Sequence, residues 1–175
     1  LAAGIWTRDL ARAHRVAAQL EAGQIYAALG ATSDMLNTQF SIVGALSSMQ
    51  RNDEAIALAE QTGKLAAEYG EPVTAVRFAA LKAQIEAVSG QLDPAAKALA
   101  RQVEVALEED NSLEAWPALA DGVSIATEQG RIREAFALAD EAMIHARNCG
   151  RPFAYRAAIF TLANLNLTSG RLAEA

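Results

Sequence analysis

The chain has 175 residues, enough for one ordinary domain, and 52% of them are hydrophobic while only 6% are aromatic. Nucleic-acid binding depends on cationic side chains that displace counterions, so 15 Lys and Arg against 21 Asp and Glu, a net charge of −6, argue against direct binding of DNA or RNA. The sequence holds no apolar run of about 18 residues, which excludes a membrane span. Its single cysteine, Cys149, excludes an internal disulfide. We therefore expect a cytoplasmic, all-α chain without membrane contact.

Helical periodicity and end signals predict a series of helices of similar length. Proline stands at the first helical position of two of them, and glycine follows most of them. Pro117 lies about a turn inside its helix, so we expect that helix to begin late, near Pro117, or to kink. Ser33-Asp34 and Asp93-Pro94 are the expected starts of two others. The predicted ranges are 7–29, 33–49, 53–69, 72–89, 93–109, 112–129, 132–149 and 152–168.

A short phrase returns along the chain with fixed spacing. Gly130-Arg-Ile-Arg-Glu-Ala135 has counterparts at 90–95 and 170–175, and a weaker one at 50–55. Their last alanines, Ala55, Ala95, Ala135 and Ala175, are each 40 residues apart, and Gly30, Gly70, Asp110 and Gly150 keep the same step. Such a period is typical of a solenoid of helix pairs, whereas a compact up-and-down bundle has no reason to repeat its turns.

The repeats divide the chain into units that we interpret as one domain cut from a longer chain. The units are 1–30 (partial), 31–70, 71–110, 111–150 and 151–175 (partial). Turns of two to four residues make neighbouring helices antiparallel.

The repeated phrase resembles the start of the second helix in tetratricopeptide repeats. Pro72 and Pro152 resemble the proline that closes such units, although the period is 40 and not 34 residues, and the tryptophan and tyrosine of the first helix are missing. The Glu-Ala pairs that carry the resemblance are Glu54-Ala55, Glu134-Ala135 and Glu174-Ala175.

Repeats of the longer length are similar to the superhelical region of large ATP-binding LuxR-type bacterial regulators, the MalT-like group. That resemblance implies a right-handed α-α superhelix between an ATPase and a helix-turn-helix. This chain contains no G-x-x-x-x-G-K-[ST] phosphate loop of its own.

Residues with catalytic potential are sparse. His145 and Cys149, four residues apart, are the one pair that could share a ligand or act as base and thiol, but a third group is missing. The acidic run Glu108-Glu109-Asp110 is best explained as a solvated turn. We therefore expect no enzyme, no cofactor and no metal site.

Candidate binding residues follow from superposing the first helices of the units at the 40-residue step. A buried seam is then marked by Val43, Ala83, Val123 and Ala163. Beside it lie further sets of residues at equivalent repeat positions, and these sets share one helix face. Small and amide-bearing residues dominate this face where a merely solvated one would carry Lys and Glu, although contacts to the next unit would explain it equally well. The candidate binding residues on it are Asn37, Ser41, Arg77, Gln84, Asp121, Ser124, Thr161 and Asn164.

These observations favour a non-enzymatic module that senses an effector or binds a protein, a peptide, or other domains of its own polypeptide, as part of a bacterial transcriptional regulator. The alternative is a free-standing adaptor that uses the same groove, and the flanking sequence of the gene would separate the two. We also expect a homodimer through the exposed last unit. Its exposed apolar residues would be Phe153, Ile159, Phe160, Leu162 and Leu165.

Overall fold

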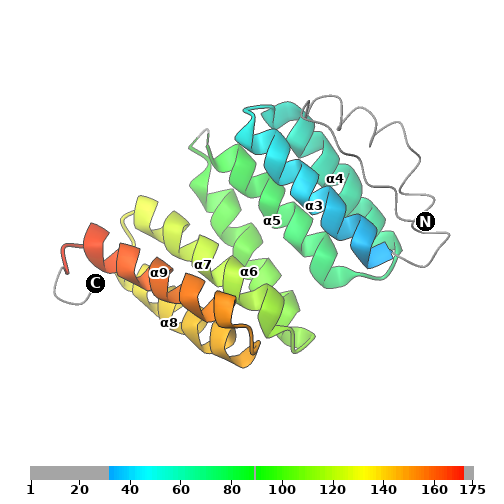
Figure 1. Cartoon of the computed structure of the whole chain (residues 1–175). Coiled ribbons are helices and arrows are strands. Elements are labelled where there is room, and N and C mark those ends of the chain that lie inside the picture. The colour runs from blue at the N-terminus through cyan, green and yellow to red at the C-terminus, as the bar shows by residue number, and fades with distance from the viewer. Residues whose placement is uncertain (1–31, 89, 172–175) are drawn as a thin grey trace, which may run out of the picture.

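The structure, a computed structural model, describes residues 32–88 and 90–171. All regular secondary structure in these two ranges is helical (Figure 1). The helices are α3 (Thr32–Ser48), α4 (Asn52–Glu68), α5 (Pro72–Ala87), α6 (Leu92–Glu108), α7 (Ser112–Glu128), α8 (Ile132–Asn148) and α9 (Pro152–Thr168). None of them is long and apolar enough to cross a bilayer. The helix predicted at 7–29 lies outside the described residues.

The helices pack on one another in chain order. Each contacts its successor from α3 to α9, and the first helices of neighbouring units also meet, α3 with α5 and α7 with α9. The array extends across the molecule from α3 at one end to α9 at the other (Figure 1). This arrangement confirms the predicted helical-repeat superhelix.

The 40-residue period reappears in the burial of the second helices, α4, α6 and α8. Their phrase alanines, Ala55, Ala95 and Ala135, have no exposed surface. The next buried positions follow at i+4, i+7 and i+11, which is one stripe of a helix. They are Ala59, Thr62 and Ala66 on α4, Leu99, Gln102 and Ala106 on α6, and Ala139, Ala142 and Ala146 on α8. Alanine at this stripe allows close approach of the helix backbones.

The turns close each helix in a left-handed conformation. Gly70, Gly130 and Gly150 have φ of 73°, 71° and 66°, and the non-glycine residues Gln50 and Asp110 adopt the same conformation with φ of 60° and 51°. After Gln50, Gly70, Asp110, Gly130 and Gly170, the next residue donates its N–H to a carbonyl five positions back, as Arg131 does to Ala126 at 2.8 Å. This is the Schellman end, which satisfies carbonyls that the helix itself leaves open.

Three sequence-based expectations about helix starts were wrong. α7 begins at Ser112 and not near Pro117, and Asn111 caps this start by accepting a hydrogen bond from the N–H of Glu114 at 3.2 Å. α3 begins at Thr32 and α6 at Leu92, so Ser33-Asp34 and Asp93-Pro94 lie inside the first turn. In that turn their carboxylates still suit the helix dipole.

Candidate functional site

The eight predicted residues all lie on the first helices of the units, two on each. We call this set the first-helix face. It comprises Asn37 and Ser41 on α3, Arg77 and Gln84 on α5, Asp121 and Ser124 on α7, and Thr161 and Asn164 on α9. The seam beside it is buried at Val43, Ala83 and Val123, as predicted, and half-buried at Ala163.

Arg77 joins three first helices. Its Nη1 donates to Glu114 Oε1 on α7 at 3.2 Å and reaches Asn37 Oδ1 on α3 at 3.5 Å, the outer limit of a hydrogen bond. Its guanidinium carbon lies 3.6 Å from the centre of the Phe40 ring, a cation–π contact. The Arg77 and Glu114 side chains retain 23% and 22% of their accessible surface. The pair is therefore partly shielded from solvent and more strongly coupled than an exposed ion pair.

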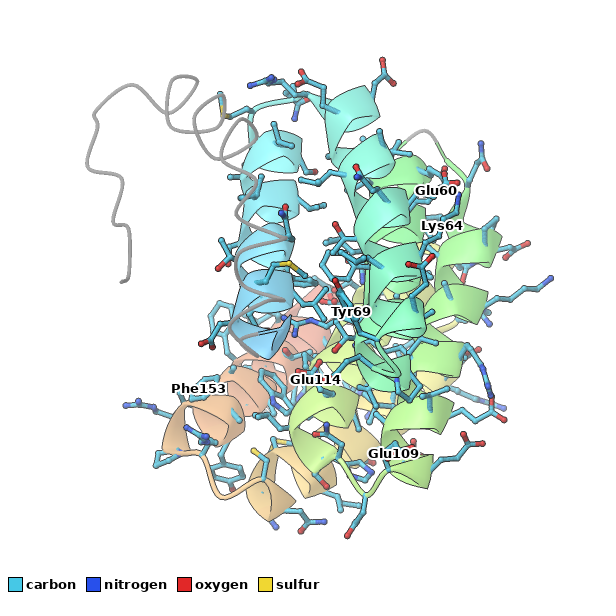
Figure 2. The ribbon with its side chains drawn as sticks, turned by 90° about the vertical axis from the view of Figure 1, so that its right-hand side faces the viewer. Glu60, Lys64, Tyr69, Glu109, Glu114 and Phe153 are labelled. Atoms are coloured by element: carbon cyan, nitrogen blue, oxygen red, sulfur yellow. The ribbon has the colours of Figure 1, made fainter. Side chains whose placement is uncertain are left out.

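Glu114 is held in place from several sides. It lies in the first turn of α7, where a carboxylate is stabilised by the helix dipole. Its own carbonyl accepts a long hydrogen bond, 3.4 Å, from the buried Gln102 side chain of α6. Figure 2 shows Glu114 near the blue, N-terminal end of α3. The Arg77 contact is thus anchored in the fold.

Gln84 and Asp121 form the second contact between α5 and α7. Gln84 Nε2 donates to Asp121 Oδ2 at 2.9 Å. Desolvation by the surrounding protein raises the pKa of the Asp121 carboxyl above its ordinary value, and the Gln84 hydrogen bond offsets part of that rise. The side chain nevertheless keeps an exposed surface. The carboxylate is therefore partly desolvated by the neighbouring helices but still accessible to a ligand.

The other four members of the face are divided between hydroxyls bonded within their own helix and exposed polar groups. Ser41 Oγ donates to the Asn37 carbonyl at 3.1 Å, and Thr161 Oγ1 donates to the Ala157 carbonyl at 3.2 Å. Ser124 and Asn164 are exposed. Two pairs of this face are thus joined between helices: Asn37 with Arg77, and Gln84 with Asp121. No hydrogen bond between helices is recorded for the other four residues of the face.

Sequence reasoning missed Phe40 and Glu114 as members of this surface. Phe40 packs edge-on against Phe78 with ring centres 5.8 Å apart, and the Arg77 guanidinium stacks on its ring. Pro117 lies 40 residues after Arg77 and is therefore its equivalent on α7. Glu114 lies one turn before Pro117 and so on the same side of that helix. A search for carboxylates one helical turn away from the repeat-equivalent positions of the face would have found Glu114.

His145 and Cys149 make separate contacts. His145 Nδ1 shares a 3.1 Å hydrogen bond with Ser112 Oγ on α7, while Cys149 Sγ donates to the Ala146 carbonyl at 3.2 Å in its own helix. Among the described residues no group of three His, Cys, Asp or Glu side chains is placed to hold a metal ion. His145 is thus part of the contact between α7 and α8.

The second helices present a different surface. Glu60 accepts hydrogen bonds from Lys64 on α4 at 2.9 Å and from Lys82 on α5 at 3.3 Å, and the Lys64 bond is the main reason that the pKa of the Glu60 carboxyl is lowered. Figure 2 shows Glu60 and Lys64 on the side of α4 turned away from α3. Exposed ion pairs of this kind contribute little to stability and are typical of a solvated face.

An open depression of about 360 Å³ lies at the turn between α5 and α6, away from the first-helix face. It is lined by Asn52, Ile56, Ile85, Glu86, Val88 and Gln91. A small-molecule pocket encloses most of its ligand, and this depression is too open to do so.

The fold and the face together define the class of this protein: a helical-repeat protein with a polar face built from the first helix of each unit. Comparison with known protein families and with curated proteins finds no match for this chain.

Proposed function

We propose that the chain is a non-enzymatic interaction module whose first-helix face binds a peptide, a protein segment or another domain of the same polypeptide. The observation that carries the proposal is the recessed Asp121 carboxylate, which accepts from Gln84 and still has exposed surface. Amide, hydroxyl and charged groups from four helices share this face. Such groups match the donors and acceptors of an extended peptide.

The resemblance of the repeated phrase to LuxR-type regulators extends the proposal to a place in a bacterial transcriptional regulator. There the module would sense a protein or a small-molecule effector. Binding would shift an equilibrium between autoinhibited and open arrangements, which requires that the partner prefer one of them.

The test begins with peptides selected from a random library on the natural chain, whose affinity is then measured against two matched variants. The first changes Gln84, Asp121 and Asn164 to alanine on the first-helix face. The second changes Gln61, Asp140 and Asn148, which are the same residue types exposed on the second helices. We expect the first variant to weaken binding about tenfold or more and the second to leave it within about twofold.

Arg77→Ala belongs in a separate variant. From sequence alone its removal together with the others should leave thermal stability nearly intact, but the contact to Glu114 and the stacking on Phe40 now predict a loss of stability.

Equal affinities of the two threefold variants, with helicity intact in both, would contradict the proposed face.

A further inference from the structure

The depression at the turn between α5 and α6 lies among inner helices of the array. Its apolar lining consists of Ile85, which is buried, Ile56, which is half-buried, and Val88, which is 77% exposed. Asn52 at the start of α4 and Gln91 at the start of α6 add side-chain amides. Since α3 precedes these helices and α7 follows them, the depression belongs to the interior of the array and not to one of its ends.

The same place two units later holds an aromatic ring and a cation. Phe136 and Arg171 stand two 40-residue steps after Ile56 and Gln91 and are their repeat equivalents. The guanidinium carbon of Arg171 lies 4.3 Å from the centre of the Phe136 ring, a cation–π contact. The repeat therefore shows which chemical groups fit together at this position.

Phe136 fills the space between α8 and α9. It packs in one cluster with Leu165, which is buried, and Leu162, which is half-buried, although both were expected from sequence to be exposed. In the earlier unit Ile56 is smaller than phenylalanine, and Gln91 is uncharged and shorter than arginine. This difference explains why a depression is left between α4 and α5.

The depression has room for an aromatic side chain. A cavity of about 150 Å³ admits benzene, and the depression measures about 360 Å³. The ring can pack on the three apolar lining residues, and the amides of Asn52 and Gln91 can bond to a peptide main chain. An open depression suits a side chain that arrives with its own polypeptide, because the peptide covers the side that the protein leaves open.

Acidic groups outnumber basic ones around the depression. Residues 50–60 and 82–93 include its whole lining and carry five carboxylates, at positions 53, 54, 60, 86 and 93, against two cations, at 51 and 82. Both cations are engaged, because Arg51 bonds to Glu54 and Lys82 bonds to Glu60. Glu86 itself lines the depression. The local charge therefore favours a ligand that carries positive charge.

We infer that the depression binds an aromatic side chain from an extended segment of a partner protein, with arginine or lysine beside it. The ring takes the place that Phe136 occupies two units later, and the neighbouring cation lies over the ring or pairs with Glu86. This site is separate from the first-helix face, so either proposal can fail without the other.

The test titrates the natural chain with three short peptides and follows the backbone amide shifts by NMR. The first is Ser-Arg-Gly-Phe-Gly-Arg-Ser, whose arginines lie on the same side of an extended chain as the phenylalanine. The second has alanine in place of phenylalanine and should bind about tenfold more weakly. The third has glutamate in place of both arginines and should bind about threefold more weakly or worse. The largest shifts should fall on the residues that line the depression.

A double substitution recreates the filled arrangement. Ile56→Phe with Gln91→Arg supplies the aromatic–cation pair found two units later, and it should weaken binding of the first peptide about tenfold or more with the helical content unchanged. The matched control is Ile144→Phe with Asn148→Arg, which adds a ring and a positive charge at exposed positions one turn apart on α8. The control should leave the affinity within about twofold of the natural value.

Glu86→Gln provides a variant that keeps the shape of the depression. It should reduce the preference for the arginine peptide over the glutamate peptide by about twofold or more, whereas Glu141→Gln, at an exposed position on α8, should not. Equal affinity for the phenylalanine and alanine peptides, or a folded double variant that binds like the natural chain, overturns the proposal. So does N-acetylphenylalanine amide that binds as tightly as the first peptide, or a set of shifts confined to the first-helix face.

Discussion

Gln84 on α5 donates its side-chain amide to Asp121 on α7, 37 residues further along the chain. Arg77 and Glu114, which also bridge α5 and α7, have the same separation. This separation is the 40-residue repeat less three residues, and residues three apart lie one turn from each other on the same side of a helix. Side chains of one first helix therefore meet the next first helix one turn nearer its N-terminus. The repeat itself brings the polar residues of the face together.

The two non-glycine turn residues predict stabilising substitutions. Gln50 and Asp110 adopt a left-handed conformation that five glycines hold at equivalent turns without steric cost. Gln50→Gly and Asp110→Gly should each raise the free energy of unfolding by about 1 kcal/mol. Urea denaturation measures this, and Gly130→Ala is the control with the opposite sign, since no atom approaches within 4 Å of an added Cβ and only the backbone strain remains. A loss of stability in both glycine variants would contradict the turn geometry.

The buried phrase alanines predict that added volume is not tolerated. Ala135 has no exposed surface, so Ala135→Leu must displace α7 or α9 and should cost about 1–3 kcal/mol of unfolding free energy. Ala137→Leu on the exposed side of α8 adds the same atoms and should stay within about 0.5 kcal/mol. Similar melting temperatures for the two variants would show that the 40-residue stripe does not face its neighbours.

The Arg77–Glu114 pair predicts a measurable coupling energy. A double-mutant cycle with alanine at each position should give about 1 kcal/mol, because both side chains are largely shielded. Arg77→Ala alone should cost more than the coupling, since it also loses the stacking on Phe40. The exposed pair Glu60–Lys64 is the reference, with a smaller coupling expected. Equal coupling in the two cycles would argue against a shielded Arg77.

Asp121 predicts a pH-dependent effect of its substitution. The folded state raises the pKa of this carboxyl, so between the unfolded and the folded pKa the native state binds more protons, and the free energy of unfolding falls as the pH rises. Asp121→Asn removes the charge and keeps an acceptor for Gln84. It should stabilise by up to about 0.5 kcal/mol at pH 7, a small gain because the side chain is exposed, and the gain should shrink as the pH falls through the folded pKa and vanish below the unfolded pKa.

Urea denaturation at pH 7 and at pH 3 measures this difference. Asp140→Asn, at an exposed position on α8, controls for the loss of one negative charge from an acidic chain. A gain that persists unchanged at pH 3 would mean that the carboxylate is not its source.

The parts of the fold that could be predicted from sequence were those repeated within it. Ala55, Ala95 and Ala135 of the repeated phrase are fully buried because the close helix approach recurs in each of the described units that contain them. Helix starts were harder: Pro117 was expected to delay or kink α7, but α7 begins at Ser112, where Asn111 caps it, and Pro117 lies inside the helix. Leu165 was expected to be exposed on the last helix, yet α7 and α8 already cover that side of it.

The site could be predicted as a set of positions but not as a set of contacts. Superposition of the units placed Arg77, Gln84 and Asp121 on one face, since helical spacing determines which residues share a side. It could not show that side chains would pair across units with an offset of one turn, because that offset depends on how neighbouring helices are staggered. Glu114 was missed for the same reason.

The most direct test of the account is a map of where a selected peptide binds the natural chain. Backbone amide shifts in NMR, recorded during titration with a peptide chosen from a random library, report the contact residue by residue. The account predicts that the largest shifts cluster on the first-helix face, around Gln84, Asp121 and Ser124, and leave the outer sides of α4, α6 and α8 unchanged. Shifts confined to those outer sides, with the first-helix face silent, would contradict it.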